Sequence, residues 1–177
     1  MTVPAVPELR VAVIGAGYWG PNLVRNFSEA PGANVVAVAD LSEERLAGIH
    51  KRFPAVRTTT DHRALFADPE IDAVCIVTPI STHRPLAEEA FAAGKHVFVE
   101  KPLAGTAGDA EAIVAAASRA QRTLMVGHTF VYNPAVTAVR DLLARRELGK
   151  GPVHRQPAGE PWAAPVRFQC PLGSRPA

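Results

Sequence analysis

The stretch Leu9–Gly20, with the sequence LRVAVIGAGYWG, constrains the fold of this chain more than any other part of it. An apolar run typical of a β-strand leads directly into glycines spaced Gly-x-Gly-x-x-Gly, and a helical pattern follows. This order is typical of a dinucleotide-binding site. Gly15 permits a sharp turn, Gly17 leaves room for a pyrophosphate, and Gly20 lets the helix pack close to the strand. The pyrophosphate would then bind free N–H groups at the start of that helix.

A second apolar run, 35–39, ends at Asp40, which is about where an acidic residue should reach the adenosine ribose hydroxyls. A carboxylate at this position favours NAD over NADP as the cofactor. The alternative is a glycine-rich turn that binds no ligand. The strand, the glycine spacing and Asp40 together disfavour that alternative.

The composition favours one soluble domain, because 177 residues that are 47% apolar and 20% charged can bury a single good core. The chain has no apolar run of membrane-spanning length, and its start, MTVPAVPELR, lacks the features of a secretion signal, so a cytoplasmic location is expected. Cys75 and Cys170 lie far apart, which argues against a disulfide framework or a metal site. A net charge of +2 with interspersed signs argues against nucleic-acid or membrane-surface partners.

From residue 9 to about residue 146, short apolar runs alternate with helical segments, which predicts a doubly wound α/β fold with a parallel sheet. The expected strands are 9–14, 34–39, 56–58, 73–78, 96–100 and 123–127. The expected helices are 19–30, 42–53, 62–67, 84–93, 108–121 and 134–146, and several follow a candidate N-cap residue. The expected strand order is 3-2-1-4-5-6, with the ligand crevice at the carboxyl ends of the strands.

Three segments follow predicted strands and should face the same crevice as the glycine motif: 78–83, 100–102 and 127–133. Lys101 is the strongest candidate for a catalytic residue, because a lysine beside a bound nicotinamide can hydrogen-bond or polarise a hydroxyl that loses a hydride. Pro102 restricts Lys101 to an extended backbone, and the bond between them is a candidate for the cis form. The alternative is a solvated surface lysine.

Three histidines, His83, His96 and His128, are possible proton carriers at neutral pH, and a structural role is the alternative for each. His96 begins a predicted strand and is the weakest functional candidate. Thr78 and Pro79 either line the nicotinamide side of the crevice or simply end a strand.

Five segments carry a resemblance to a known family: GAGYWG, ADLSEER, VTPISTH, GKHVFVEKPLAGT and GHTFVYNPAV. In this order and spacing, over about residues 9–150, the chain resembles the glucose-fructose oxidoreductase, inositol dehydrogenase and MocA (Gfo/Idh/MocA) family of NAD(P)-dependent oxidoreductases. The resemblance implies a Rossmann domain that binds NAD, catalytic Lys101 near the reacting carbon, and a sugar, nucleotide sugar or cyclic polyol as substrate. The last segment looks most like members that act on UDP-linked amino sugars. The implied cofactor-binding residues are Gly15, Ala16, Gly17, Tyr18, Trp19, Gly20, Asp40, Thr78, Pro79, His83, Glu100, Lys101 and Asn133.

The end of the chain departs from the family pattern. We expect residues 1–150 to form the dinucleotide-binding domain and the proline-rich and arginine-rich residues 151–177 to be a disordered tail. Family members continue into a second domain that binds substrate and supports oligomerisation. The residues of the tail permit codons that, when read one nucleotide later, encode segments such as SRRVNLG and ALWDLAPH. These segments resemble the sequence that follows this domain in relatives. A frameshift is therefore our hypothesis, and a genuine alternative C-terminus or a linker to a partner remains the alternative.

Two functions remain open for the chain as given. The first is an NAD-dependent oxidoreductase acting on a sugar-type hydroxyl, with impaired activity in this form and homo-oligomers only in a full-length form. The second is a module that binds NAD without turnover. A methyltransferase that uses S-adenosylmethionine would explain neither Gly20 nor the Glu100–Pro102 segment.

Overall fold

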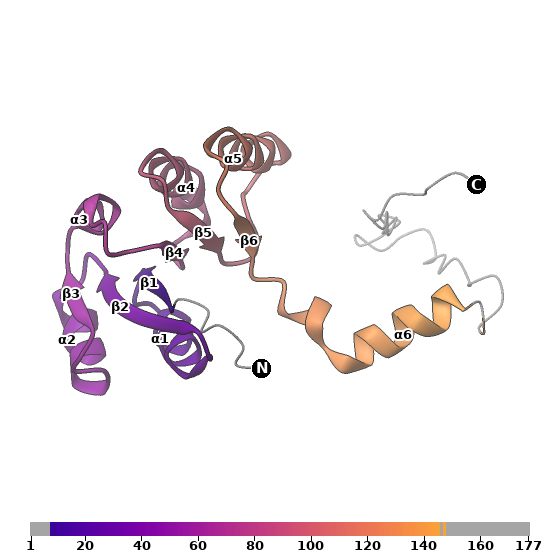
Figure 1. Ribbon diagram of the computed structural model, residues 1–177, viewed down its shortest axis with the longest axis horizontal. Coiled ribbons are helices and arrows are strands. Elements are labelled where there is room, and N and C mark those ends of the chain that lie inside the picture. Colours follow the sequence, from indigo (N-terminus) through magenta and orange to yellow (C-terminus); the bar gives the residue numbers. More distant parts are fainter. Residues whose placement is uncertain (1–7, 146, 148–177) are drawn as a thin grey trace, which may run out of the picture. The chain divides into compact units, whose positions relative to one another are not determined.

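The computed structural model describes residues 8–145 and residue 147 of the chain. The chain divides into two compact units, 1–129 and 130–177, and each is described by itself. In the first unit, all strands are parallel and form one sheet in the order β3-β2-β1-β4-β5-β6 (Figure 1). This is the doubly wound order that the sequence predicts for a Rossmann fold.

Every strand and helix predicted for the first unit is present, with ends that differ from the prediction by at most two residues. The strands are β1 (Leu9–Ile14), β2 (Ala33–Ala39), β3 (Arg57–Thr59), β4 (Ala73–Ile76), β5 (His96–Val99) and β6 (Leu124–Val126). The helices are α1 (Gly20–Glu29), α2 (Glu43–Arg52), α3 (His62–Ala67), α4 (His83–Ala92) and α5 (Ala107–Ala120). A short 3-10 turn, η1 (Ile80–Thr82), was not predicted; it leads directly into α4.

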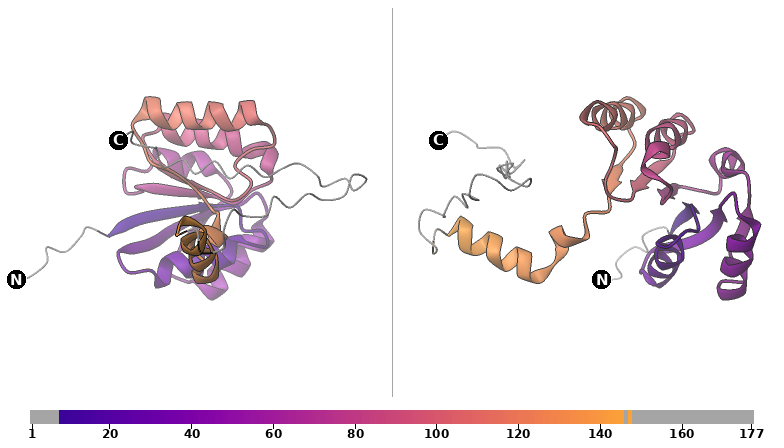
Figure 2. Two further views of the ribbon diagram at one scale, coloured as in Figure 1. Left: turned by 90° about the vertical axis from the view of Figure 1, so that its right-hand side faces the viewer. Right: turned by 180° about the vertical axis from the view of Figure 1, so that it is seen from behind.

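Strand β4, with the sequence AVCI, is apolar and buried along its whole length, which is typical of a strand whose two faces are covered by helices. On one face, strand residues such as Ile14 and Ile76 pack in one cluster with α3, α4 and α5. On the other face, residues such as Val13 and Cys75 pack in a second cluster with α1 and α2. Figures 1 and 2 show α4 and α5 on one side of the sheet and α1 and α2 on the other.

Local capping fixes where several helices begin. The Ser42 side chain accepts from the backbone N–H of Arg45 at the start of α2, and Thr106 accepts from Asp109 at the start of α5. Such side-chain acceptors satisfy N–H groups that have no partner inside the helix. Only three residues, 40–42, therefore separate the end of β2 from the start of α2, and this short loop contains Asp40.

The register of the sheet brings the carboxyl ends of its central strands together. Ile14 at the end of β1 pairs with Ala39 of β2 and with Ile76 of β4, and Ile76 in turn pairs with Val99 of β5. The loops that follow these four strands therefore leave the sheet side by side, which is the edge where ligands bind in this fold class.

The second unit contains helix α6 (Pro134–Ala144), preceded by the 3-10 turn η2 (Thr129–Tyr132), which begins at the unit boundary. The Asn133 side chain caps α6 by accepting from the N–H of Ala135 at 2.9 Å. The apolar residues Val136, Val139 and Leu143 of α6 are exposed. The predicted tail, 151–177, and the frameshift hypothesis lie outside the described residues.

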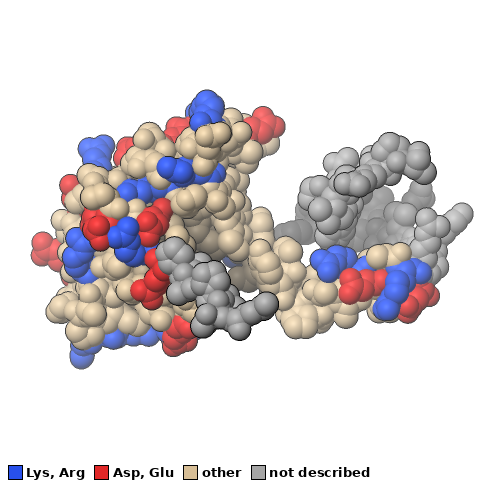
Figure 3. All heavy atoms as spheres, viewed as in Figure 1, with Lys and Arg blue, Asp and Glu red and all other residues tan. Residues whose placement is uncertain are grey.

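The surface of the first unit carries acidic and basic side chains interspersed with one another on the face that Figure 3 shows. Among residues 8–145 and 147, no helix combines the length and the apolar composition needed to cross a membrane.

Candidate dinucleotide-binding site

A pocket of about 820 Å³ opens in the first unit where the central strands end. Its volume falls within the range of roughly 300–1,000 Å³ that is usual for cofactor and ligand sites. The walls come from the segments after β1, β2, β4 and β5, which lie far apart in the sequence. The predicted site residues that line the pocket are Gly15, Gly17, Tyr18, Trp19, Asp40, Thr78, Pro79, His83, Glu100 and Lys101.

The three glycines of the motif are required for different reasons. Gly15 has φ of +103°, and a Cβ there would lie 2.7 Å from the carbonyl oxygen of Val77. A Cβ at Gly20 would overlap the carbonyl oxygen of Gly15. At Gly17, in contrast, no atom of the described residues other than its two chain neighbours lies within 4 Å of the position that a Cβ would take. Gly15 and Gly20 are therefore needed by the backbone itself, whereas Gly17 leaves open space in the pocket wall.

Asp40 holds the glycine loop in place. Its Oδ2 accepts from the N–H of Ala16 at 2.6 Å, and its Oδ1 accepts from the N–H of Ser42 at 2.8 Å. The guanidinium of Arg45 lies 3.7 Å from the same carboxylate, whose side chain is only 8% exposed. Because each carboxylate oxygen accepts more than one hydrogen bond, Asp40 keeps acceptor capacity for a ligand. The N–H of Ala16, a predicted cofactor-binding residue, is already used by Asp40.

The loop after β5 presents Lys101 to the pocket. Lys101 is exposed, lines the pocket, and is joined to Pro102 by a cis peptide bond, as the sequence allowed. Glu100 Oε2 accepts from the N–H of Lys101 at 3.0 Å. A Cβ at Gly127 would lie 3.1 Å from the other oxygen of Glu100, so Gly127 makes room for this carboxylate.

His83 is buried in the pocket wall rather than free to exchange protons with solvent. Its Nε2 lies 2.9 Å from the carbonyl oxygen of Thr78, and its Nδ1 lies 3.1 Å and 3.2 Å from those of Pro102 and Leu103. The ring is only 2% exposed.

The other two histidines lie outside the pocket lining. His96 Nδ1 accepts from the N–H of Thr123 at 3.0 Å, which is a structural contact between the loops that lead into β5 and β6. His128 is exposed next to the end of β6.

A compact turn shapes the wall after β4. The Thr82 hydroxyl donates to the carbonyl oxygen of Pro79 at 2.7 Å and lies 2.7 Å from the Thr78 hydroxyl. These contacts stabilise the η1 turn, so Thr78 and Pro79 form a fixed part of the wall.

Three predicted site residues do not line the pocket. Ala16 and Gly20 are buried, and each supports the glycine loop through its backbone geometry. Asn133 belongs to the second unit, where its side chain caps α6. Its contact with a cofactor stays a prediction.

Ile80, Thr82 and Pro102 also line the pocket, as expected for the segments 78–83 and 100–102. Sequence reasoning missed several other lining residues: Leu41, Arg45, Thr60, His62, Arg63, Pro85, Leu86 and Glu89. Leu41 and Thr60 follow strands closely, so the rule that predicted the other site residues could have found them. His62 and Glu89 lie on α3 and α4, and their atoms Nε2 and Oε2 approach to 3.5 Å. Only the packing of the two helices reveals that pair.

Comparisons with known proteins agree with this geometry. A model of the Gfo/Idh/MocA family, described as an oxidoreductase family with an NAD-binding Rossmann fold, matches residues 9–128. The chain is 35% identical over 148 residues to D-apiose dehydrogenase of Paraburkholderia graminis, covering 84% of this chain and 40% of that protein. It is 35% identical over 157 residues to inositol 2-dehydrogenase of Acidothermus cellulolyticus, covering 85% of this chain and 46% of that protein.

A solved structure gives the same result. An oxidoreductase from Agrobacterium radiobacter, determined in complex with NAD⁺, L-tartaric acid and magnesium, matches with a TM-score of 0.75 and 33% identity. The match covers 81% of this chain and 42% of that one. The chain thus spans less than half the length of these relatives. It belongs to the Gfo/Idh/MocA oxidoreductase family, and residues 9–128 match the NAD-binding Rossmann domain of that family.

Proposed function

We propose that this chain binds NAD in the pocket of the first unit and supplies the cofactor-binding part of a dehydrogenase. The observation that carries the proposal is the open space at Gly17, beside the first turn of α1. Within the described residues, no side chain caps that turn. Pro21 has no N–H, and the N–H of Asn22 donates to the carbonyl oxygen of Trp19 at 3.0 Å, so Gly20 contributes the N–H of that turn that can donate to a pyrophosphate.

The order of the strands supports different roles for the two ends of the pocket. Asp40 follows β2 and Lys101 follows β5, with β1 and β4 between them in the sheet. We assign Asp40 to the adenosine ribose, which favours NAD over NADP. We assign Thr78, Pro79 and Lys101 to the nicotinamide end.

The chemistry that we propose uses Lys101 as the catalytic residue. NAD, when bound, supplies the hydride acceptor. As the hydroxyl proton of the substrate passes to solvent water, the Lys101 ammonium, which is exposed in the pocket, donates a hydrogen bond to the oxygen and stabilises the negative charge that develops on it. Glu100 accepts a hydrogen bond of 3.0 Å from the N–H of Lys101 and so fixes the backbone of Lys101. The side chain that carries the ammonium is therefore attached at a defined position.

The proposed substrate is a sugar, a nucleotide sugar or a cyclic polyol. D-apiose dehydrogenase and inositol 2-dehydrogenase, which resemble this chain at 35% identity, are named for a sugar and a cyclic polyol. Each of these molecules carries several hydroxyl groups, and the oxygen of any one of them can accept the hydrogen bond that Lys101 would donate.

The test has two stages on the 177-residue chain. Isothermal titration first measures the affinity for NAD and for NADP. Absorbance of NADH then reports turnover with apiose, inositols and UDP-linked amino sugars. Replacing Lys101 by Ala should lower kcat by about a hundredfold or more, because a fixed hydrogen-bond donor to an oxygen that develops negative charge contributes about that much. Lys51→Ala, at an exposed lysine of α2, is the matched control and should leave kcat unchanged.

Normal turnover after Lys101→Ala would exclude the catalytic role of this residue. NAD binding without turnover of any of these compounds would instead favour the alternative function, a module that holds NAD only.

A further inference from the structure

Among the residues that the structure describes, the polar residues that are buried as whole residues are His83 and Lys95. Lys95 has a clear structural role, because its ammonium donates to the carbonyl oxygens of Asp68 and Ile71 at 2.6 Å and 2.8 Å. His83 differs, since it lies in the wall of the dinucleotide pocket and the proposed chemistry does not use it.

Both ring nitrogens of His83 face backbone carbonyl oxygens, and these oxygens belong to two different loops. Nε2 faces Thr78, which follows β4, whereas Nδ1 faces Pro102 and Leu103, which follow β5. A carbonyl oxygen only accepts hydrogen bonds, and a neutral imidazole carries its N–H on Nδ1 or on Nε2, so each tautomer donates to one of the two loops. The imidazole therefore lies between the two loops, with carbonyl oxygens of both within 3.2 Å of its nitrogens.

The ring is fixed to a rigid support. His83 is the first residue of α4, whose Leu86, Ala87, Ala90 and Phe91 are buried in the core. A side chain held by a packed helix keeps its position better than one held by a loop. The loops that carry Thr78 and Lys101 therefore both contact a side chain that α4 holds in place.

We propose that His83 is a positioning residue that ties the Thr78 loop to the Lys101 loop and so sets where Lys101 stands in the pocket. The inference rests on the proposed function insofar as it assigns Lys101 to the nicotinamide end. It gives His83 a role through its neighbours, in place of the direct cofactor contact that the family resemblance implies.

The two ring nitrogens can be tested separately. The side-chain nitrogen of Asn stands where Nδ1 does, and that of Gln can reach the position of Nε2. His83→Asn should keep the tie to Pro102 and Leu103 and release Thr78, whereas His83→Gln should do the opposite. His83→Leu retains neither bond.

Hydrogen–deuterium exchange of the free 177-residue chain measures each tie directly. His83→Gln should speed exchange in peptides covering 100–106 by about tenfold or more and leave 77–82 unchanged, and His83→Asn should give the reverse pattern. In His83→Leu both segments should exchange faster, and the Kd for NAD should rise about fivefold or more. His96→Asn, whose ring contacts Thr123 outside the pocket lining, is the matched control and should change neither segment.

The proposal is overturned if all three variants keep wild-type exchange in both segments. It is equally overturned if exchange rises uniformly through β1 and β4 as well, because His83 would then be an ordinary core residue. If the local pattern holds but the wild-type chain does not bind NAD, the tie is real and the proposed function is wrong. If NAD binds but both ties are unaffected, the proposed function survives without this role for His83.

Discussion

Gly17 shows how much a single residue can decide in this protein. Its neighbours in the motif, Gly15 and Gly20, are required because a Cβ at either would meet backbone atoms. Gly17 meets nothing among the described atoms, so nothing in the fold alone requires a glycine there. We propose that a ligand approaches the backbone closely at this position, which would require a glycine there.

We predict that Gly17→Val leaves folding intact and weakens NAD binding by about tenfold or more, because the added methyl groups occupy the open space. Thermal unfolding and isothermal titration measure the two effects. Gly20→Ala is the contrast: its Cβ would overlap the Gly15 carbonyl, and relieving that overlap should cost about 1–3 kcal/mol of stability. Unchanged NAD affinity in Gly17→Val would show that the pyrophosphate does not bind at this loop.

Asp40 has a structural role in the glycine loop, and we propose that it also binds the cofactor. Asp40→Ala leaves the N–H groups of Ala16 and Ser42 without their acceptor, which should cost about 1–3 kcal/mol of stability. It should also weaken NAD binding and narrow the preference for NAD over NADP, since the negative charge near the ribose is lost.

Thr106→Ala is the control for Asp40, because it removes the N-cap of α5 outside the pocket lining. It should cost about 1 kcal/mol of stability and leave the ratio of the two cofactor affinities unchanged. If Asp40→Ala likewise leaves that ratio unchanged, Asp40 does not select the cofactor.

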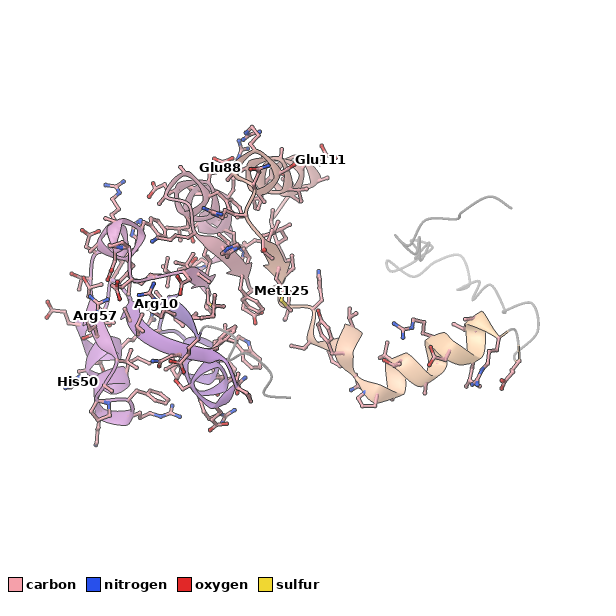
Figure 4. The ribbon with its side chains drawn as sticks, in the orientation of Figure 1. Arg10, His50, Arg57, Glu88, Glu111 and Met125 are labelled. Carbon is pink, nitrogen blue, oxygen red and sulfur yellow. The ribbon has the colours of Figure 1, made fainter. Side chains whose placement is uncertain are left out.

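At the scale of elements, an ion pair joins β1 to the start of β4. Arg10, labelled in Figure 4, donates from its backbone N–H to Asp72 at 2.8 Å and from its guanidinium to both carboxylate oxygens at 3.2 Å. The hydrogen bonds from Arg10 hold the pKa of Asp72 below its ordinary value of 3.8. Both side chains are about one-third exposed, so solvent screening keeps the contribution modest.

This ion pair predicts a specific acid response. Because the pKa of Asp72 is lower in the folded chain, its contribution is fully present above pH 3.8 and is lost as the pH falls through the folded value. Asp72→Asn should therefore be less stable than wild type near neutral pH, and the difference should shrink in acid. Urea unfolding at a series of pH values measures it. A difference that stays constant below pH 3.8 would contradict the prediction.

At the scale of the whole molecule, the first unit is built as a sheet between two apolar clusters, and its pocket lies beyond the ends of the strands rather than inside either cluster. Asp40, Thr78 and Lys101 lie outside both clusters, whereas Ile14, Ala39 and Leu86 belong both to the pocket wall and to the first cluster. A ligand can fill the pocket without repacking the interior.

Binding to this site should stabilise the first unit by mass action. NAD at a concentration of one hundred times its Kd should add about 2.7 kcal/mol to the free energy of unfolding. We predict a rise in Tm with NAD and a smaller rise with NADP at the same concentration, measured by differential scanning fluorimetry. The Gly17→Val variant should lose most of the rise. No rise with NAD in the wild-type chain would contradict the proposed function.

The amino-acid sequence by itself determined the element order, the strand order and the loops that carry the site. These features depend on local chemistry. Strands buried on both faces are continuous apolar runs, helices begin at residues such as Ser42 and Thr106 that can cap them, and the tight turn after β1 needs the glycine motif. The position of Lys101 follows from the same logic, because it stands directly after a predicted strand.

The tertiary structure decided which groups meet. His83 contacts the carbonyl oxygens of Pro102 and Leu103, 19 and 20 residues further along the chain, and Asp40 contacts Ala16, 24 residues before it. These contacts depend on the register of parallel strands and on the orientation of the helices that cover them. Neither quantity is encoded in a local pattern, because both result from the packing of the whole sheet.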